Sequence, residues 1–362
     1  MDQDELKILK ELSESFGPPG FERETASIVK KYVKDFADEI TIDKLGSVMF
    51  KIKGTAEKPV ILIPAHSDEI GFVVSGIHKS GFLTFNTLGG WFDQVLLAQR
   101  VMVRTTRKGD RLGVITSVPP HVLTPEERKI LVTKDKMFID VGCTSKEDAE
   151  KDGIRIGDPV VPVSPFSVIR DGKIVVGKAF DDRLGIFAAI LALKRVKEQG
   201  IDHPNTVVGA ATTQEEVGLR GAKTTAYSVD PDVAFCLEID ISSDVPGVEE
   251  HRAPSKMGEG ITILTHDGSM IPNQPLKEFV ITVAEEANIK YQLSAMPQGG
   301  TDAGAIHISR VGVPSIVLGI PTRHIHSHVS MTSIEDIERM INLLIELIKR
   351  TDKETVTSFT SI

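Results

Sequence analysis

The sequence has few of the residues that stabilise secreted or membrane-embedded proteins. Its 362 residues include only two cysteines, Cys143 and Cys236, and because each lies in an apolar, strand-like run, we expect free thiols and not a disulfide. No uninterrupted apolar run approaches the roughly 18 residues of a membrane span. The N-terminal segment is acidic and lacks a basic region followed by an apolar one. We therefore expect a cytoplasmic protein without a membrane anchor.

Positive charge is also in the minority. Lys and Arg number 42 against 51 Asp and Glu, which gives a formal net charge of -9. Such a balance disfavours nucleic acids and anionic membranes, so neither is expected as a partner. The hydrophobic fraction of 41% and the charged fraction of 26% are typical of a globular chain that buries a full core.

Secondary-structure patterns change twice along the chain. Two amphipathic helices, a hairpin over 41–54 and a buried strand over 59–66 come first. From about 71 to 163, short β-type runs alternate with Gly, Asp and Pro turns, which is typical of an all-β module. Beyond Gly177, helices and strands alternate, as in a three-layer α/β/α sheet.

The economical interpretation is an α/β domain built from both ends of the chain. We expect residues 1–68 and 166–352 to form this discontinuous domain, with an all-β, barrel-like module over 69–165 inserted between them. A polar, proline-containing stretch over 119–135 is expected to be a long surface loop of that module. Residues 353–362 resemble a frayed C-terminal tail.

Side chains that can bind metals gather where predicted strands end. Open α/β sheets place their sites at this edge, so we expect these side chains to converge. Taken alone each group has a plain structural explanation, such as a helix cap for the aspartates or a solvated turn for the glutamates. The five groups are His66 and Asp68; Asp181 and Asp182; Glu215 and Glu216; Glu238 and Asp240; and His324, His326 and His328.

Two of these groups have a spacing that suits divided roles. His66 could bind a metal while Asp68, two residues on, accepts its second ring N–H. Because neighbouring side chains of an extended chain diverge, one of Glu215 and Glu216 could bind a metal while the other faces the reacting water.

The remaining groups leave alternatives open. Glu238 and Asp240 share one face of an apolar strand, and a carboxylate there needs a partner, a metal or an exposed strand end. At most one or two of the three histidines near the C-terminus need be ligands. Imidazole and carboxylate donors without thiolates favour a catalytic site for Zn²⁺, Co²⁺ or Mn²⁺, and their number suits a pair of metals about 3.5 to 4 Å apart.

Several segments resemble, in type and order, those of a known family. The chain is similar over almost its whole length to the tetrahedral aminopeptidases of metallopeptidase family forty-two, some of whose members are also labelled glutamyl aminopeptidase, deblocking aminopeptidase or endoglucanase. The segments that carry the resemblance are SFGPPGFE, AHSDEIGF, GKAFDDRLG, TTQEEVGLRGA, EIDISSDVPG and GGTDAGAIHISRVGVPSIVLGIPTRHIHSHVSM.

The resemblance implies a role for each candidate residue. It implies two divalent metal ions per subunit, zinc or cobalt, bound by His66 and Glu238 at one position, by Glu216 and His326 at the other, and by Asp181 at both. It also implies Glu215 as the general base, Asp68 as the residue that orients His66, and an unusual peptide bond before Asp182, for which cis geometry is one option. The family usually has Asp where Glu238 stands, which leaves Asp240 as a competitor.

The implied reaction is removal of the N-terminal residue from short peptides that have a free N-terminus, by a hydroxide bound to both metals. The resemblance further implies that the module over 69–165 mediates dimerisation, that dimers form a tetrahedral dodecamer, and that the loop over 119–135 reaches a neighbouring subunit's site.

Two rival functions use the same residues differently. A glycoside hydrolase would need an acid and a base beside a sugar, usually with aromatic stacking, but aromatic residues are 5% of the chain and the histidines would be unexplained. A non-catalytic metal-binding assembly protein would need no base, so the Glu215 side chain would be dispensable.

Overall fold

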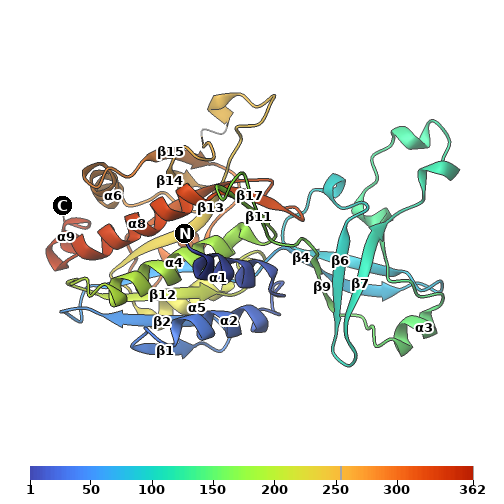
Figure 1. Ribbon diagram of the computed structural model, residues 1–362, viewed down its shortest axis with the longest axis horizontal. Helices are drawn as coiled ribbons and strands as arrows, with labels where there is room; N and C mark the ends of the chain where they lie inside the picture. The colour runs from blue at the N-terminus through green and yellow to red at the C-terminus, as the bar shows by residue number, and fades with distance from the viewer. Residues whose placement is uncertain (253–254, 362) are drawn as a thin grey trace.

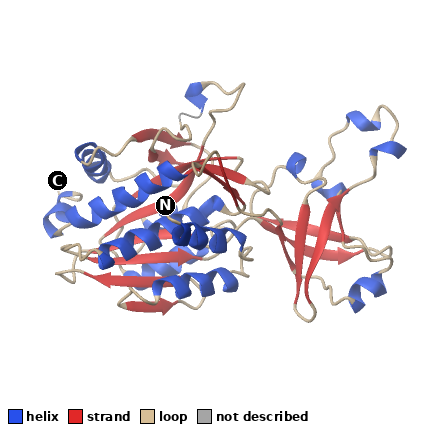
Figure 2. Ribbon diagram, in the orientation of Figure 1, coloured by secondary structure: helices blue, strands red, loops and turns tan. Residues whose placement is uncertain are grey.

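The computed structural model describes residues 1–252 and 255–361 and has two lobes. Figure 1 shows a large lobe in which helices cover a twisted sheet, and beside it a smaller lobe made mostly of strands. Figure 2 shows the same division, with most of the helix in the large lobe.

The large lobe is built on an 11-stranded sheet with the order β1-β2-β12-β3-β13-β16-β17-β11-β10 and with β14 and β15 branching from β16. Its centre is parallel: β3 pairs with β12 and β13, and β13 pairs with β16. The strands are β1 (Glu39–Ile42), β2 (Val48–Lys53), β3 (Val60–His66), β10 (Ser167–Ile169), β11 (Ile174–Gly177), β12 (Thr206–Thr212), β13 (Val233–Ile241), β14 (Ile261–Asp267), β15 (Tyr291–Met296), β16 (Ser315–Arg323) and β17 (Ser330–Ser333).

Helices pack on both faces of this sheet, which confirms the expected three-layer architecture. Alternate side chains of β3 belong to different cores: Ile61 and Ile63 to the one that contains α4, and Leu62 to the one that contains α5 and α7. A strand buried on both faces requires a continuous apolar run, which is why its sequence predicted it. The helices are α1 (Gln3–Glu14), α2 (Arg23–Val33), α4 (Phe180–Glu198), α5 (Arg220–Val229), α6 (Gln274–Glu286), α7 (Asp302–Ile306), α8 (Ile334–Arg350) and α9 (Lys353–Ser358).

The smaller lobe is a closed barrel with the strand order β4-β5-β8-β7-β6-β9. Its core holds apolar side chains from different strands, among them Phe72, Val101 and Ile139, all fully buried. The long loop after β7 is exposed and projects from the barrel (Figure 1), as its composition predicted. The remaining elements of this lobe are β4 (Gly71–Ile77), β5 (Leu83–Leu88), β6 (Arg100–Thr105), β7 (Gly109–Thr116), β8 (Phe138–Asp140), β9 (Pro159–Pro162) and α3 (Lys146–Lys151), with single 3₁₀ turns at η1 (Asp93–Val95), η2 (Pro120–Val122), η3 (Glu127–Lys129) and η4 (Lys134–Lys136); a further turn, η5 (Glu250–Arg252), lies in the large lobe.

The C-terminal residues differ from the frayed tail that we expected. They form α9, which Asp352 caps by accepting the N–H of Thr355 at 2.8 Å. The Phe359 ring is only 4% exposed and lies 5.5 Å from the ring of Phe279. An N-cap and one buried aromatic side chain therefore hold this segment against the large lobe.

Cys143 and Cys236 are both free thiols, as expected. Within the described ranges, no helix combines the length and the apolar composition that crossing a membrane requires.

Candidate metal centre

Strand ends and one helix start place the predicted ligands around a common point. His66 is the last residue of β3, Glu216 follows β12, Glu238 lies in β13 and His326 follows β16. Asp181 lies at the start of α4, where its backbone is not helical, and the Asp181–Asp182 peptide bond is cis. The structure thus brings together side chains that are far apart in the sequence, at the edge of the sheet where we expected them.

The first of two ligand groups contains His66, Asp181 and Glu238. His66 Nε2 lies 2.8 Å from Asp181 Oδ1 and 3.8 Å from Glu238 Oε1. One potential ligand atom from each residue lies within 4.8 Å of the others, which is close enough for one ion to contact all three.

The second group contains Asp181, Glu216 and His326. His326 Nε2 lies 3.3 Å from Asp181 Oδ2 and 3.8 Å from Glu216 Oε1. Asp181 therefore belongs to both groups and turns one oxygen toward each. An aspartate between two groups of nitrogen and oxygen donors fits a pair of bridged divalent cations.

The geometry also separates the two candidates on β13. Glu238 belongs to the first group, whereas Asp240 belongs to neither group found among the described residues. Burial raises the pKa of Asp240, and its polar neighbours are Ser294 and Thr262, on strands β15 and β14. The structure therefore favours Glu238 over Asp240 as a ligand.

The acids of the cluster are crowded in a buried space. Burial and the neighbouring carboxylates raise the pKa of Glu216 to about 8 and raise the pKa values of Glu215 and Glu238 well above their usual range. Asp181 is also buried, but the hydrogen bonds of His326 and His66 hold its pKa below its usual value. Divalent cations would offset this concentration of negative charge, so the donor set fits metal ions by charge as well as by chemistry.

Asp68 contacts His66 differently from the expected arrangement. His66 Nδ1 lies 3.1 Å from the backbone carbonyl of Asp68, whereas the Asp68 carboxylate is 3.6 Å away. That carboxylate instead accepts the backbone N–H groups of Glu215 and Glu216, at 2.9 and 3.1 Å. Asp68 therefore supports both the imidazole and the segment that carries the two glutamates.

The other two C-terminal histidines do not join the cluster. His324 is exposed. His328 is buried, and its ring lies 5.2 Å from that of Trp91 in the barrel lobe. One histidine of the three, His326, therefore lies in the cluster.

Sequence patterns gave no role to the barrel segment that contacts His326. The Gly90 carbonyl lies 2.8 Å from His326 Nδ1, so the ring donates there and leaves Nε2 free to bind a metal. A side chain at Gly90 would approach His326 Nδ1 to 3.0 Å, and one at Gly89 would approach the Glu216 carboxylate to 2.8 Å. Glycines here let the barrel backbone lie against the ligands, and the GG pair was the signal available in the sequence.

Two buried acids next to the cluster were also missed. Glu22 Oε1 accepts the N–H of Gln214 at 3.1 Å, and burial together with the charge of Asp68 raises its pKa to about 7. Asp302 accepts the hydroxyl of Thr212 at 2.5 Å, and burial raises its pKa to about 6. Through the Gln214 N–H, Glu22 therefore adds a third hydrogen bond to the backbone segment that Asp68 binds at Glu215 and Glu216.

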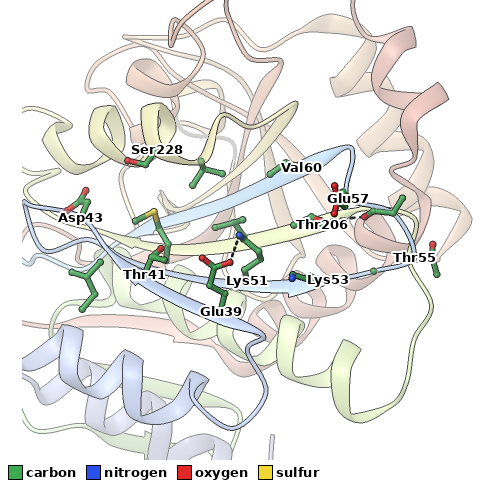
Figure 3. A pocket seen from close by; sticks show the side chains of 16 residues that line it. Glu39, Thr41, Asp43, Lys51, Lys53, Thr55, Glu57, Val60, Thr206 and Ser228 are labelled. Atoms are coloured by element: carbon green, nitrogen blue, oxygen red, sulfur yellow. Dashed lines mark hydrogen bonds and ion pairs between the residues drawn. The ribbon is translucent and has the colours of Figure 1, made fainter.

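The ligand cluster opens into a cavity of about 600 Å³. A second hollow of about 660 Å³ lies over β1, β2 and β12 (Figure 3). There Lys51 and Glu39 form an ion pair at 2.6 Å, and none of the lining residues belongs to either ligand group. The cavity over the two candidate ligand groups is therefore the candidate active site.

Comparison with known proteins gives the family. The sequence profile described as M42 glutamyl aminopeptidase matches residues 46–343. The chain belongs to peptidase family M42. M42 peptidases are metal-dependent, and this M42 chain is accordingly a hydrolase that acts on peptides as an aminopeptidase.

Individual M42 relatives cover nearly the whole chain. The structure of a TET aminopeptidase from a marine sediment archaeon, Thaumarchaeota archaeon SCGC AB-539-E09, matches with a TM-score of 0.97, 60% identity and 99% coverage of both chains. A lysyl aminopeptidase of Pyrococcus furiosus is 33% identical over 96% of this chain and 98% of its own. A Pyrococcus horikoshii TET1 peptidase, described as assembling into a tetrahedron or a large octahedral shell, matches with a TM-score of 0.84, 31% identity and coverage of 96% and 100%.

Proposed function

We propose that this M42 enzyme removes the N-terminal residue of short peptides with two divalent cations, zinc or cobalt, and with Glu215 as general base. The observation that carries the proposal is the position of Asp181, which turns Oδ1 to His66 and Oδ2 to His326. A single cation would need only one of the two groups, whereas a shared carboxylate suits a pair.

The residues divide the work between metal binding and proton transfer. His66, Glu238, Glu216 and His326 would hold the cations together with Asp181. The cations, when bound, supply polarisation of the scissile carbonyl and a lowered pKa of the attacking water. Glu215 lines the same cavity, with Oε2 4.0 Å from His66 Nε2, and belongs to neither ligand group. It is therefore the acid that remains to take the proton of the water and to pass it to the leaving amine.

Selection of chain ends follows from the charge of the site. A peptide with a free N-terminus brings an ammonium group next to the scissile bond, and buried carboxylates can bind it. An internal peptide bond brings no such charge. Acetylating the N-terminus should therefore abolish cleavage.

Self-association is the second part of the proposal, with the barrel lobe as the dimerisation surface and a dodecamer as the final assembly. Exposed apolar side chains are frequent on this lobe, which supports a binding surface there. Those on the barrel and its long loop are Phe92, Leu112, Val114, Val118, Val122, Ile130, Leu131 and Ile156. Native mass measurements on the intact chain and on a variant lacking 123–131 test the assembly. Unchanged assembly and unchanged peptide turnover in that variant would contradict a role for the loop.

Glu215→Gln tests the catalytic proposal most simply, because the amide keeps the shape of the side chain but cannot take a proton. We expect metal content and melting temperature to stay near wild type, and turnover of an aminoacyl p-nitroanilide to fall at least about a hundredfold. Near wild-type turnover would remove Glu215 as the base and would favour the rival in which the cluster serves assembly only. Release of reducing sugars from a glucan, without peptide cleavage, would favour the glycoside hydrolase.

A further inference from the structure

The cavity above the candidate metal ligands has mostly apolar walls. Apart from the ligands and Glu215, its walls are formed mainly by aliphatic side chains and glycines. The apolar side chains are Leu219, Ile239, Ile241, Met296 and Ile325. Gln298 is the polar addition, and among the described residues that line the cavity there is no lysine or arginine.

These five residues line the same cavity as the proposed ligands. Ile239 is 3% exposed and belongs to the core that contains α4, so the accessible apolar surface comes from the other four. Ile239 follows Glu238 and donates its N–H to the Glu238 carboxylate at 3.1 Å. Ile325 precedes His326, and Leu219 is three residues beyond Glu216. A peptide whose first carbonyl lies at the cations must place its first side chain within reach of these groups.

The lysine and arginine side chains that are nearest in sequence to the cavity residues contact other groups. Arg323 donates to Asp244 at 2.8 Å. Arg220 is exposed, donates to the Gln214 side chain at 2.9 Å and does not line the cavity. Lys178 and Arg183 are buried and bind Glu69 at 2.6 and 3.1 Å. A carboxylate on the first substrate residue would therefore enter the cavity without a positively charged side chain to pair with.

The acids of the cavity are likewise committed. Asp181, Glu216 and Glu238 are the proposed metal ligands and Glu215 is the proposed base. The negative charge that remains beyond those roles would bind the ammonium group at the N-terminus of the substrate, next to the scissile bond. A lysine side chain on the substrate would therefore be desolvated without a carboxylate of its own. An aliphatic side chain has no such cost and gains from contact with the apolar wall.

We infer that this enzyme prefers peptides whose N-terminal residue is neutral and aliphatic, such as leucine or methionine, over those that begin with glutamate, aspartate or lysine. The inference rests on the proposed aminopeptidase function and specifies the class of its substrate. The family description names glutamyl activity and one relative is a lysyl aminopeptidase. The apolar wall of this cavity suits neither the negative side chain of glutamate nor the positive side chain of lysine.

A panel of short peptides that differ only in the first residue tests the inference on the metal-loaded wild-type enzyme. We expect kcat/KM for leucine and methionine to exceed that for alanine at least about tenfold, because each added methylene in an apolar pocket contributes to discrimination. Glutamate and lysine should be at least about a hundredfold poorer than leucine. Glutamate or lysine turned over as well as leucine would overturn the inference. Failure to cleave any member of the panel would instead contradict the aminopeptidase proposal itself.

A charge-introducing variant tests whether these side chains set the preference. Ile241 is 44% exposed at the cavity, so Ile241→Lys should fold, and it should shift the ratio of glutamate to leucine turnover at least about tenfold toward glutamate. The matched control is Ile308→Lys, because Ile308 is 69% exposed and does not line the cavity. Met296→Lys is a second variant at the same wall. An unchanged ratio in both cavity variants, with native circular dichroism, would overturn the assignment of this wall to the first side chain of the substrate.

Discussion

Asp68 holds the backbone of Glu215 through a hydrogen bond of 2.9 Å from the Glu215 N–H to Asp68 Oδ1. The other carboxylate oxygen accepts the next N–H, that of Glu216, at 3.1 Å. Asp68, which accepts both hydrogen bonds, is fully buried. One side chain therefore fixes the segment that carries the proposed base and a proposed ligand, while its own backbone carbonyl faces the ring of His66.

Asp68→Asn should impair turnover without unfolding the protein. Two backbone N–H groups need two acceptor oxygens, and an amide offers one oxygen and one NH₂ group, so one N–H would face another donor. We expect kcat to fall about 10- to 100-fold. The measurement is steady-state kinetics, with metal content determined on the same sample. Asp35→Asn, at an exposed position, is the matched control, and full turnover in Asp68→Asn would show that these hydrogen bonds do not matter.

Gly90→Ala should weaken binding at the second ligand group. The added methyl group would lie 3.0 Å from His326 Nδ1, where the Gly90 carbonyl now accepts the ring N–H. The imidazole must move, and a displaced Nε2 binds a metal less tightly. Titration of the metal-free protein with Zn²⁺ should show a site about tenfold weaker than in wild type. Identical titration curves would mean that the barrel backbone does not orient His326.

Acid should destabilise the protein partly through His328. Burial lowers the pKa of His328 to about 4, whereas in the unfolded chain it is near 6.5. The unfolded state therefore binds more protons between these values, so this contribution to stability is complete above pH 6.5 and is lost as the pH falls toward 4. The shift corresponds to at most roughly 3 kcal/mol.

Melting temperatures measured across this pH range test the assignment. His328→Phe removes the titrating group and keeps an apolar ring against Trp91, so its melting temperature should fall less on acidification than that of wild type. His121→Phe, at an exposed position, should follow wild type. Parallel curves for all three proteins would rule out His328 as a source of acid sensitivity.

The central sheet and most of the ligand cluster could be predicted from the sequence because both depend on local patterns. Continuous apolar runs identify strands buried on both faces, such as β3, and parallel strands bring their carboxyl ends to one edge. That rule was sufficient to place His66, Glu216 and His326 together. It did not decide between Glu238 and Asp240, because alternation along a strand gives both the same face. Their surroundings distinguish them in the structure: Glu238 lies with His66 and Asp181, whereas Asp240 lies near Thr262 and Ser294.

Contacts between distant segments explain what the sequence did not predict. The hydrogen bond between Gly90 and His326 joins residues 236 positions apart, and no periodicity connects a barrel loop to a ligand of the sheet. The helix α9 was missed because a polar composition resembles a tail, although Asp352 gives an N-cap pattern and Phe359 supplies the buried contact. In both places, tertiary packing gives a conformation that composition alone does not indicate.

The metal content of Asp181→Asn tests the central claim most directly, because Asp181 is the residue that both ligand groups share. Elemental analysis of wild type after loading with Zn²⁺ or Co²⁺ should give about two ions per chain. His326→Ala should retain about one ion, at the first group, and Asp181→Asn should fall below one while keeping its native circular dichroism. Asp181→Asn that still binds two ions per chain, or wild type that binds only one, would contradict the account.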